Sequence, residues 1–109
     1  MYTVDLHQKF ETVQTAESNL LVQIKLARKT KEKALCLIVG YGSSGGTHKI
    51  RTAILQALED LSEKHQIKDF IIGSDLDIFN PKYQTLKGKE WIDKDCLRRK
   101  NKGEIIVIL

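Results

Sequence analysis

No other part of this sequence limits the fold as much as six consecutive apolar residues that run directly into a glycine-rich turn. The apolar run is Ala34-Leu35-Cys36-Leu37-Ile38-Val39, and the turn is Gly40-Tyr41-Gly42-Ser43-Ser44-Gly45-Gly46. A strand with one solvated face alternates apolar and polar residues, whereas a strand covered on both faces is apolar throughout. The run therefore predicts a strand over residues 34–39 that is buried on both sides.

The other periodic segments add three strands and two helices. Residues 2–6 alternate as a short strand does, and apolar residues at spacings of three or four predict helices that begin near Thr12 and near Thr47. Residues 70–72 and 104–109 are further strand candidates. The order βαβα followed by two strands predicts an α/β (α+β) fold with helices on a mixed sheet. Its first two strands are expected to be parallel, joined by a right-handed crossover.

Size and composition fit one domain in a reducing compartment. The chain has 109 residues, of which 41% are hydrophobic, so we expect a single domain over residues 1–109 with one core. Cys36 and Cys96 lie far apart without a CxxC spacing, which argues against a disulfide framework and a zinc knuckle. No apolar run approaches the ~18 residues of a membrane span, and the N-terminus lacks a signal sequence. We therefore expect a cytoplasmic protein with no membrane partner.

Positive charge is gathered in two segments. Residues 25–33 hold five basic residues and one acidic residue, and residues 82–102 hold eight and three, although the net charge is only +4. Such segregation favours a polyanion such as nucleic acid as partner. Solvated lysines at a helix end and in a loop explain the charge equally well. The second segment falls within residues 73–103, which lack clear periodicity and which we interpret as a basic insertion that serves function or is ordered by a ligand.

Asp5 and His7 are the first candidates for catalysis. They lie two positions apart on the first predicted strand and so point to the same face, where the Asp5 carboxylate can orient or charge-stabilise the His7 imidazole. An imidazole that titrates near neutral pH can act as general acid or base at a phosphodiester. Because the spacing is common, a surface role for both residues is the alternative.

The glycine-rich turn is a candidate phosphate-binding loop. Residues 40–45 match GxGxxG between a strand and a helix, but the acid that a dinucleotide site has ~20 residues further on is lacking, which argues against a nicotinamide cofactor. Small residues let backbone N–H groups approach an anion, and the start of the next helix adds positive charge. Parallel first strands would bring this loop beside His7. The predicted nucleic-acid contacts are Gly40, Tyr41, Gly42, Ser43, Ser44, Gly45, Lys49 and Arg51.

Taken together, these motifs resemble the Smr domain, the small MutS-related domain, over nearly the whole chain. The resemblance rests on Asp5-Leu6-His7 after the first strand, on Gly40-Tyr41-Gly42 after the second, and on the closing Gly103-Glu104-Ile105-Ile106-Val107-Ile108. It implies a two-layer βαβαββ sandwich similar to the C-terminal domain of translation initiation factor three. It also implies a nucleic-acid endonuclease, which is a phosphodiester hydrolase, or a ribosome-associated factor.

The resemblance implies that His7 is the general acid or base, and that Asp5 positions it or helps to hold a divalent metal such as magnesium or manganese. RNA is slightly favoured over DNA, because its 2′-hydroxyl is an internal nucleophile that one base can activate. DNA needs an activated water, most often with a metal. Two residues depart from the family pattern: Gln8 replaces a glycine and Val39 replaces the second-motif histidine. His48 is a candidate substitute for that histidine, and an exposed position at the helix start is its alternative.

Aromatic residues near basic ones supply further candidate contacts. Tyr41 can stack on a base or pack on its own loop, and Trp91 can stack on RNA or anchor the insertion to the core. Arg98 and Arg99 are candidate phosphate contacts. Three functions stay open: an endonuclease, a non-catalytic nucleic-acid or ribosome-binding module, and a nucleotide-binding domain that uses the glycine loop.

Overall fold

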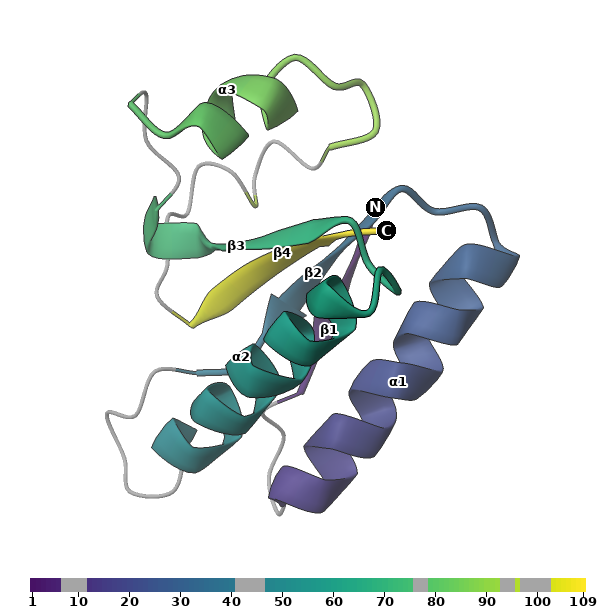
Figure 1. The fold of residues 1–109 in the computed structure, drawn as a ribbon, viewed down its shortest axis with the longest axis vertical. Helices are drawn as coiled ribbons and strands as arrows, with labels where there is room; N and C mark the ends of the chain where they lie inside the picture. Colours follow the sequence, from purple (N-terminus) through teal and green to yellow (C-terminus); the bar gives the residue numbers. More distant parts are fainter. Residues whose placement is uncertain (7–11, 41–46, 76–78, 93–95, 97–102) are drawn as a thin grey trace.

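The described residues form one mixed sheet with two long helices and a short one. The computed structural model describes residues 1–6, 12–40, 47–75, 79–92, 96 and 103–109 (Figure 1). The elements are β1 (Tyr2–Asp5), α1 (Val13–Lys29), β2 (Ala34–Ile38), α2 (Thr47–Glu63), β3 (Asp69–Ile72), the 3-10 turn η1 (Gly73–Asp75), α3 (Pro81–Leu86) and β4 (Glu104–Ile108). The strands make one sheet in the order β1–β2–β4–β3. The predicted α+β architecture with a mixed sheet is confirmed.

The directions of the strands place the carboxyl ends of β1, β2 and β3 at one edge of the sheet. β1 and β2 are parallel, as predicted, with Asp5 opposite Ile38. β4 runs antiparallel to β2 and to β3, with Glu104 opposite Ile38. β3 therefore runs in the same direction as β1 and β2, and the three strands end at the same edge of the sheet.

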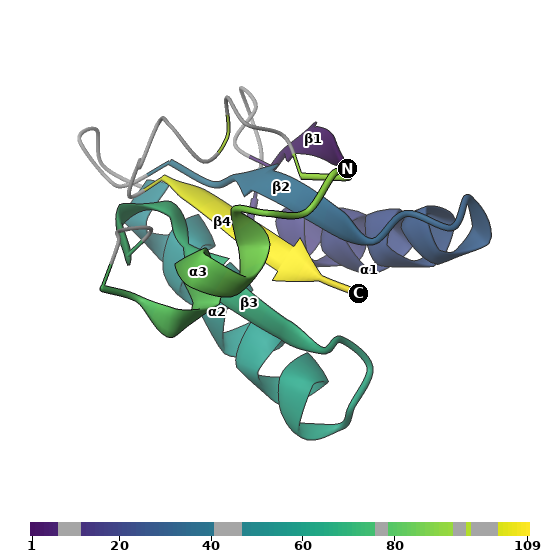
Figure 2. The same ribbon diagram turned by 90° about the horizontal axis from the view of Figure 1, so that it is seen from above.

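The two inner strands are buried on both sides, as the apolar run predicts. Alternate residues of β2 enter two separate core clusters: Leu35 and Leu37 pack under α1 and α2, whereas Ala34 and Cys36 pack on the opposite side. We call these sides the helical face and the insertion face. In Figure 1, α1 and α2 lie next to each other across the sheet, and Figure 2 shows α3 on the other side. β4 alternates in the same way, so each face receives apolar side chains from both inner strands.

Local sequence signals set the ends of α1. Thr12 caps its start, because the Thr12 hydroxyl accepts a hydrogen bond from the Thr15 backbone N–H at 3.2 Å and the Thr15 hydroxyl accepts one from the Thr12 N–H at 2.9 Å. The helix ends where Lys31 turns left-handed at φ 62° and the Glu32 N–H donates to the Ala27 carbonyl.

In the described ranges, no helix combines the length and the apolar character needed to cross a membrane.

Residues 79–92 fold over the insertion face. Asn80 caps α3 by accepting a hydrogen bond from the Lys82 N–H at 2.9 Å, and Pro81 occupies the first helical position. The Lys82 ammonium reaches back to β3, where it donates to the Asp69 carboxylate at 2.9 Å and to the Phe70 carbonyl at 3.1 Å. The two layers that the resemblance implies thus gain a partial third layer built from the insertion.

Truncation of Leu37 tests the importance of the helical face. Its side chain is fully buried beneath α1 and α2, so Leu37→Ala should lower the free energy of unfolding by about 2–5 kcal/mol through lost burial and the cavity left behind. Leu21→Ala on α1 is the matched control, because Leu21 is 48% exposed. Urea denaturation measures both variants, and equal losses would contradict the assignment of the core.

Candidate functional site

The candidate site lies at the edge where β1, β2 and β3 end, which we call the carboxyl edge. The Leu6 N–H donates to the Ile38 carbonyl at 2.8 Å, and the Val39 N–H donates to the Gly103 carbonyl at 2.7 Å, so pairing continues one residue past β1 and β2. In Figure 1, α2 starts near the same edge, at the lower left. Sheets of this kind bind ligands beyond the carboxyl ends of parallel strands.

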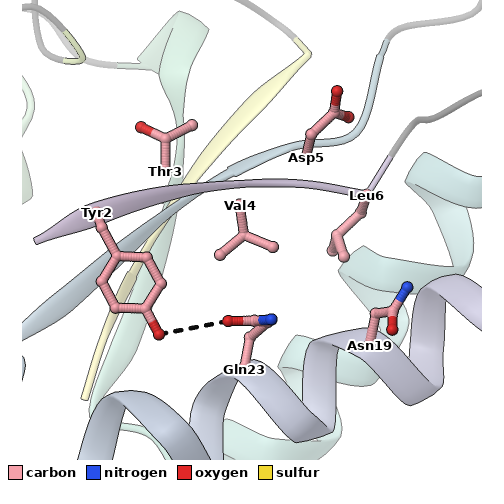
Figure 3. Close-up of a pocket in the computed structure, with 7 residues that line it drawn as sticks. All are labelled: Tyr2, Thr3, Val4, Asp5, Leu6, Asn19 and Gln23. Atoms are coloured by element: carbon pink, nitrogen blue, oxygen red, sulfur yellow. Dashed lines mark hydrogen bonds between the residues drawn. The ribbon is translucent and has the colours of Figure 1, made fainter. Parts of the chain in front are cut away.

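Asp5 is the candidate catalytic residue that the structure describes. It ends β1 and is exposed. In Figure 3, Asp5 and Thr3 point away from α1, whereas Tyr2, Val4 and Leu6 point toward it. The Asp5 side chain therefore lies on the insertion face of β1, which is an edge strand of the sheet. His7 lies outside the described residues, so its position beside Asp5 stays a prediction.

A groove of about 300 Å³ runs along β1 on its helical side. Residues of β1 line one wall, and Asn19 and Gln23 of α1 line the other (Figure 3). At one end, the Tyr2 hydroxyl donates a hydrogen bond to Gln23 Oε1 at 3.4 Å. Burial raises the pKa of the Tyr2 phenol above its ordinary range, and the Glu32 carboxylate raises it further. The phenol is therefore protonated at neutral pH, which makes it a hydrogen-bonding group and not a base.

The residue two positions after β2, Gly40, has a backbone conformation that favours glycine. Gly40 has φ 69°, in the left-handed region that side chains with a Cβ disfavour. The preceding residue, Val39, is fully buried in the core of the helical face. Gly40 thus adopts a left-handed conformation directly after a buried residue at the carboxyl edge. Residues 41–46, which include the predicted contacts from Tyr41 to Gly45, lie outside the described residues.

The conformation of Gly40 gives a direct test of the turn. Gly40→Ala should destabilise the protein by about 1–2 kcal/mol, because a Cβ crowds the backbone in the left-handed region. Gly88→Ala is the control, since a Cβ at Gly88 would meet nothing within 4 Å. Thermal unfolding distinguishes the two variants. Equal melting temperatures would show that Gly40 tolerates a side chain and does not fix the turn.

The first turns of α2, which start near the carboxyl edge, carry two basic residues. Lys49 is exposed and Arg51 is half-buried, and Lys49 lines a shallow depression with Thr52, Ala53 and Gln56. The helix start adds partial positive charge of its own. His48 belongs to α2, but its side chain lies outside what the structure describes, so its role as a substitute histidine stays a prediction.

Two neighbouring residues of the insertion anchor it to the sheet. Ile92 is buried on the insertion face, and Trp91 packs partly buried against the same cluster. Of the two interpretations of Trp91, the structure supports the anchor. Arg98 and Arg99 lie outside the described residues, and their contact with phosphates stays a prediction.

The structure also gathers three residues that the sequence did not connect. Cys36 of β2, Cys96 of the insertion and Glu104 of β4 are all buried, and their ligand atoms lie within 4.8 Å of one another. The thiols of Cys36 and Cys96 donate to Glu104 Oε2 at 3.9 and 3.7 Å. In the described part of the chain, no other group of three or more His, Cys, Asp or Glu side chains has the spacing of metal ligands.

Comparisons with known proteins do not assign the chain to a family. The chain matches no protein-family model, no curated protein and no solved structure.

Proposed function

We propose that this protein binds nucleic acid and cleaves phosphodiester bonds in RNA, as an endonuclease of the Smr type. The proposal includes the βαβαββ arrangement similar to the C-terminal domain of translation initiation factor three, with the basic insertion between its last two strands. The observation that carries it is the parallel pairing of β1 and β2, with Asp5 opposite Ile38. Because of this pairing, β1 and β2 end at the same edge of the sheet, and His7 and the glycine-rich turn are the next residues along the sequence after these strand ends.

Basic groups near this edge favour a nucleic-acid backbone as ligand. The exposed Lys49 lies within the first turns of α2, and the proposal adds Arg51, Arg98 and Arg99 as phosphate contacts. The backbone N–H groups of the glycine-rich turn would bind a phosphate beside them. Because such contacts recognise the backbone, they do not select a base sequence.

The proposed chemistry uses one imidazole and one carboxylate. His7 accepts the proton of a 2′-hydroxyl, whose oxygen attacks the adjacent phosphorus. The bond between phosphorus and the 5′-oxygen breaks, that oxygen takes a proton from a water molecule, and the other fragment ends in a 2′,3′-cyclic phosphate. His7 then returns its proton to solvent. The Asp5 carboxylate orients the His7 ring and stabilises its charged form.

Cleavage of DNA would need a water nucleophile, for which a bound magnesium or manganese ion supplies the activation. Asp5 offers one carboxylate oxygen, but it belongs to no group of three potential metal ligands among the described residues. RNA can be cleaved without such a metal, because its 2′-hydroxyl is an internal nucleophile, and we propose RNA as the substrate.

The second candidate function is a non-catalytic nucleic-acid or ribosome-binding module, which Val39 favours. This position corresponds to the histidine of the second Smr motif, and here its apolar side chain is fully buried under the helices. A mechanism that needs two family histidines would require another residue, such as His48, in its place.

Cleavage of labelled single-stranded RNA tests the first function. His7→Ala and Asp5→Asn should each lower the cleavage rate, by about 10²–10⁴-fold for the general base, without loss of RNA binding. His65→Ala and Asp60→Asn are matched controls, because both residues are exposed and distant from the start of α2. Asp60 lies in the last turns of α2, and His65 lies in the turn that follows the helix. RNA with 2′-O-methyl groups should bind and resist cleavage. Binding of RNA by all variants with no cleavage by the wild type would instead support the binding module.

Salt dependence tests the contacts of α2. If Lys49 neutralises one phosphate, Lys49→Ala should reduce the slope of log Kobs against log salt by about 1. Lys64→Ala is the control, because Lys64 follows the other end of α2, ~22 Å away along a helix. Fluorescence anisotropy with a labelled RNA measures both slopes. Equal slopes for Lys49→Ala and the wild type would remove α2 from the interface.

A further inference from the structure

The cluster of Cys36, Cys96 and Glu104 is unlike the rest of the layer in which it lies. The other buried members of the insertion-face core are apolar: Ala34, Ile71, Leu86, Ile92 and Ile106. Among the described residues, Glu104 is the only buried one with a polar or charged side chain, at 5% exposure. Burial of a carboxylate is costly unless a strong partner compensates it. Both thiols lie near the Glu104 carboxylate, and thiolate and carboxylate groups together are ligands of metal cations.

The spacing of the three side chains suits a tetrahedral metal. Bonds of ~2.3 Å to sulfur and ~2.0 Å to oxygen place the two ligand atoms about 3.5 Å apart across a tetrahedral zinc ion. The observed distances from Glu104 Oε2 to the two sulfurs are 3.9 and 3.7 Å. Small side-chain movements would therefore bring the three atoms to zinc distances.

The donor set also selects among metals. Two thiolates and one carboxylate oxygen are ligands that zinc accepts, whereas magnesium and manganese prefer oxygen donors alone. Three protein ligands leave the fourth tetrahedral position for a water molecule or another small ligand.

We propose that Cys36, Cys96 and Glu104 form a zinc-binding site that fastens the insertion to the sheet. The ligands come from β2, from the insertion and from β4, so a bound ion would link two inner strands to residue 96. Asp5, Ile38 and Glu104 follow one another across the sheet in register. Zinc would therefore hold the insertion close to the carboxyl edge. This site does not depend on the proposed nuclease function.

Titration of the reduced protein with cobalt(II) tests the site. We expect one cobalt ion per chain and the intense near-ultraviolet absorption of thiolate-to-cobalt charge transfer, which one equivalent of zinc should abolish because zinc binds such sites more tightly. Binding should release protons and strengthen as pH rises, because the thiols must ionise. Zinc should also raise the melting temperature, since only the folded chain assembles the site.

Single substitutions assign the ligands. Cys96→Ser and Glu104→Gln should each weaken cobalt binding by at least about tenfold. Loss of a residue that only orients a metal ligand already costs about that much, and these variants remove a ligand itself. The His65→Ala control should bind as the wild type does, because His65 is exposed in the turn that follows α2. Circular dichroism checks that each variant is folded. If Cys96→Ser fails to fold, Glu104→Gln still tests the site, because glutamine retains the shape of the glutamate side chain.

Two results would overturn the proposal. One is a folded, fully reduced wild-type protein that shows no charge-transfer absorption with cobalt. The other is cobalt absorption that persists unchanged in both Cys96→Ser and Glu104→Gln, which would place the metal elsewhere. The cobalt measurements do not depend on RNA cleavage. The zinc site and the nuclease function can therefore be refuted independently of each other.

Discussion

β2 is hydrogen-bonded to β1 on one side and to β4 on the other, while its side chains are buried on both faces. Buried backbone N–H and C=O groups must be paired, and a strand between two others pairs them along its whole length. This arrangement fixes the direction of β1 and the alternation of side chains between the faces. It also fixes the edge of the sheet at which β2 ends. The candidate site is therefore a consequence of how one apolar strand is buried.

Most of the fold could be predicted from periodicity, because each long element has one dominant environment. The apolar stripes of α1 and α2 face the sheet. Four apolar residues of α1 at spacings of three or four, Ala16, Leu20, Ile24 and Ala27, are buried. The four strands lie within a residue or two of their predicted bounds. The insertion was less predictable, since α3 is short and is set by the Asn80 cap and by contacts with β3 that are distant in the sequence.

The candidate site was predictable only in part. Asp5 at the end of β1 and Gly40 at the end of β2 follow from strand order, and their edge follows from the parallel pairing. The group formed by Cys36, Cys96 and Glu104 could not be predicted in the same way, because its members come from three separate segments with no motif spacing. The one signal for it in the sequence is a glutamate at the start of an otherwise apolar strand, where burial needs a compensating partner.

The contacts of Lys82 have a consequence for how the molecule behaves among other copies of itself. An outer strand of a sheet exposes unpaired backbone groups, to which a strand of another chain can add. On β3, the Lys82 ammonium already occupies the Phe70 carbonyl and is held there by Asp69. A strand that approached this side would have to displace a charged group from both partners. The insertion thus makes one margin of the sheet a poor template for aggregation.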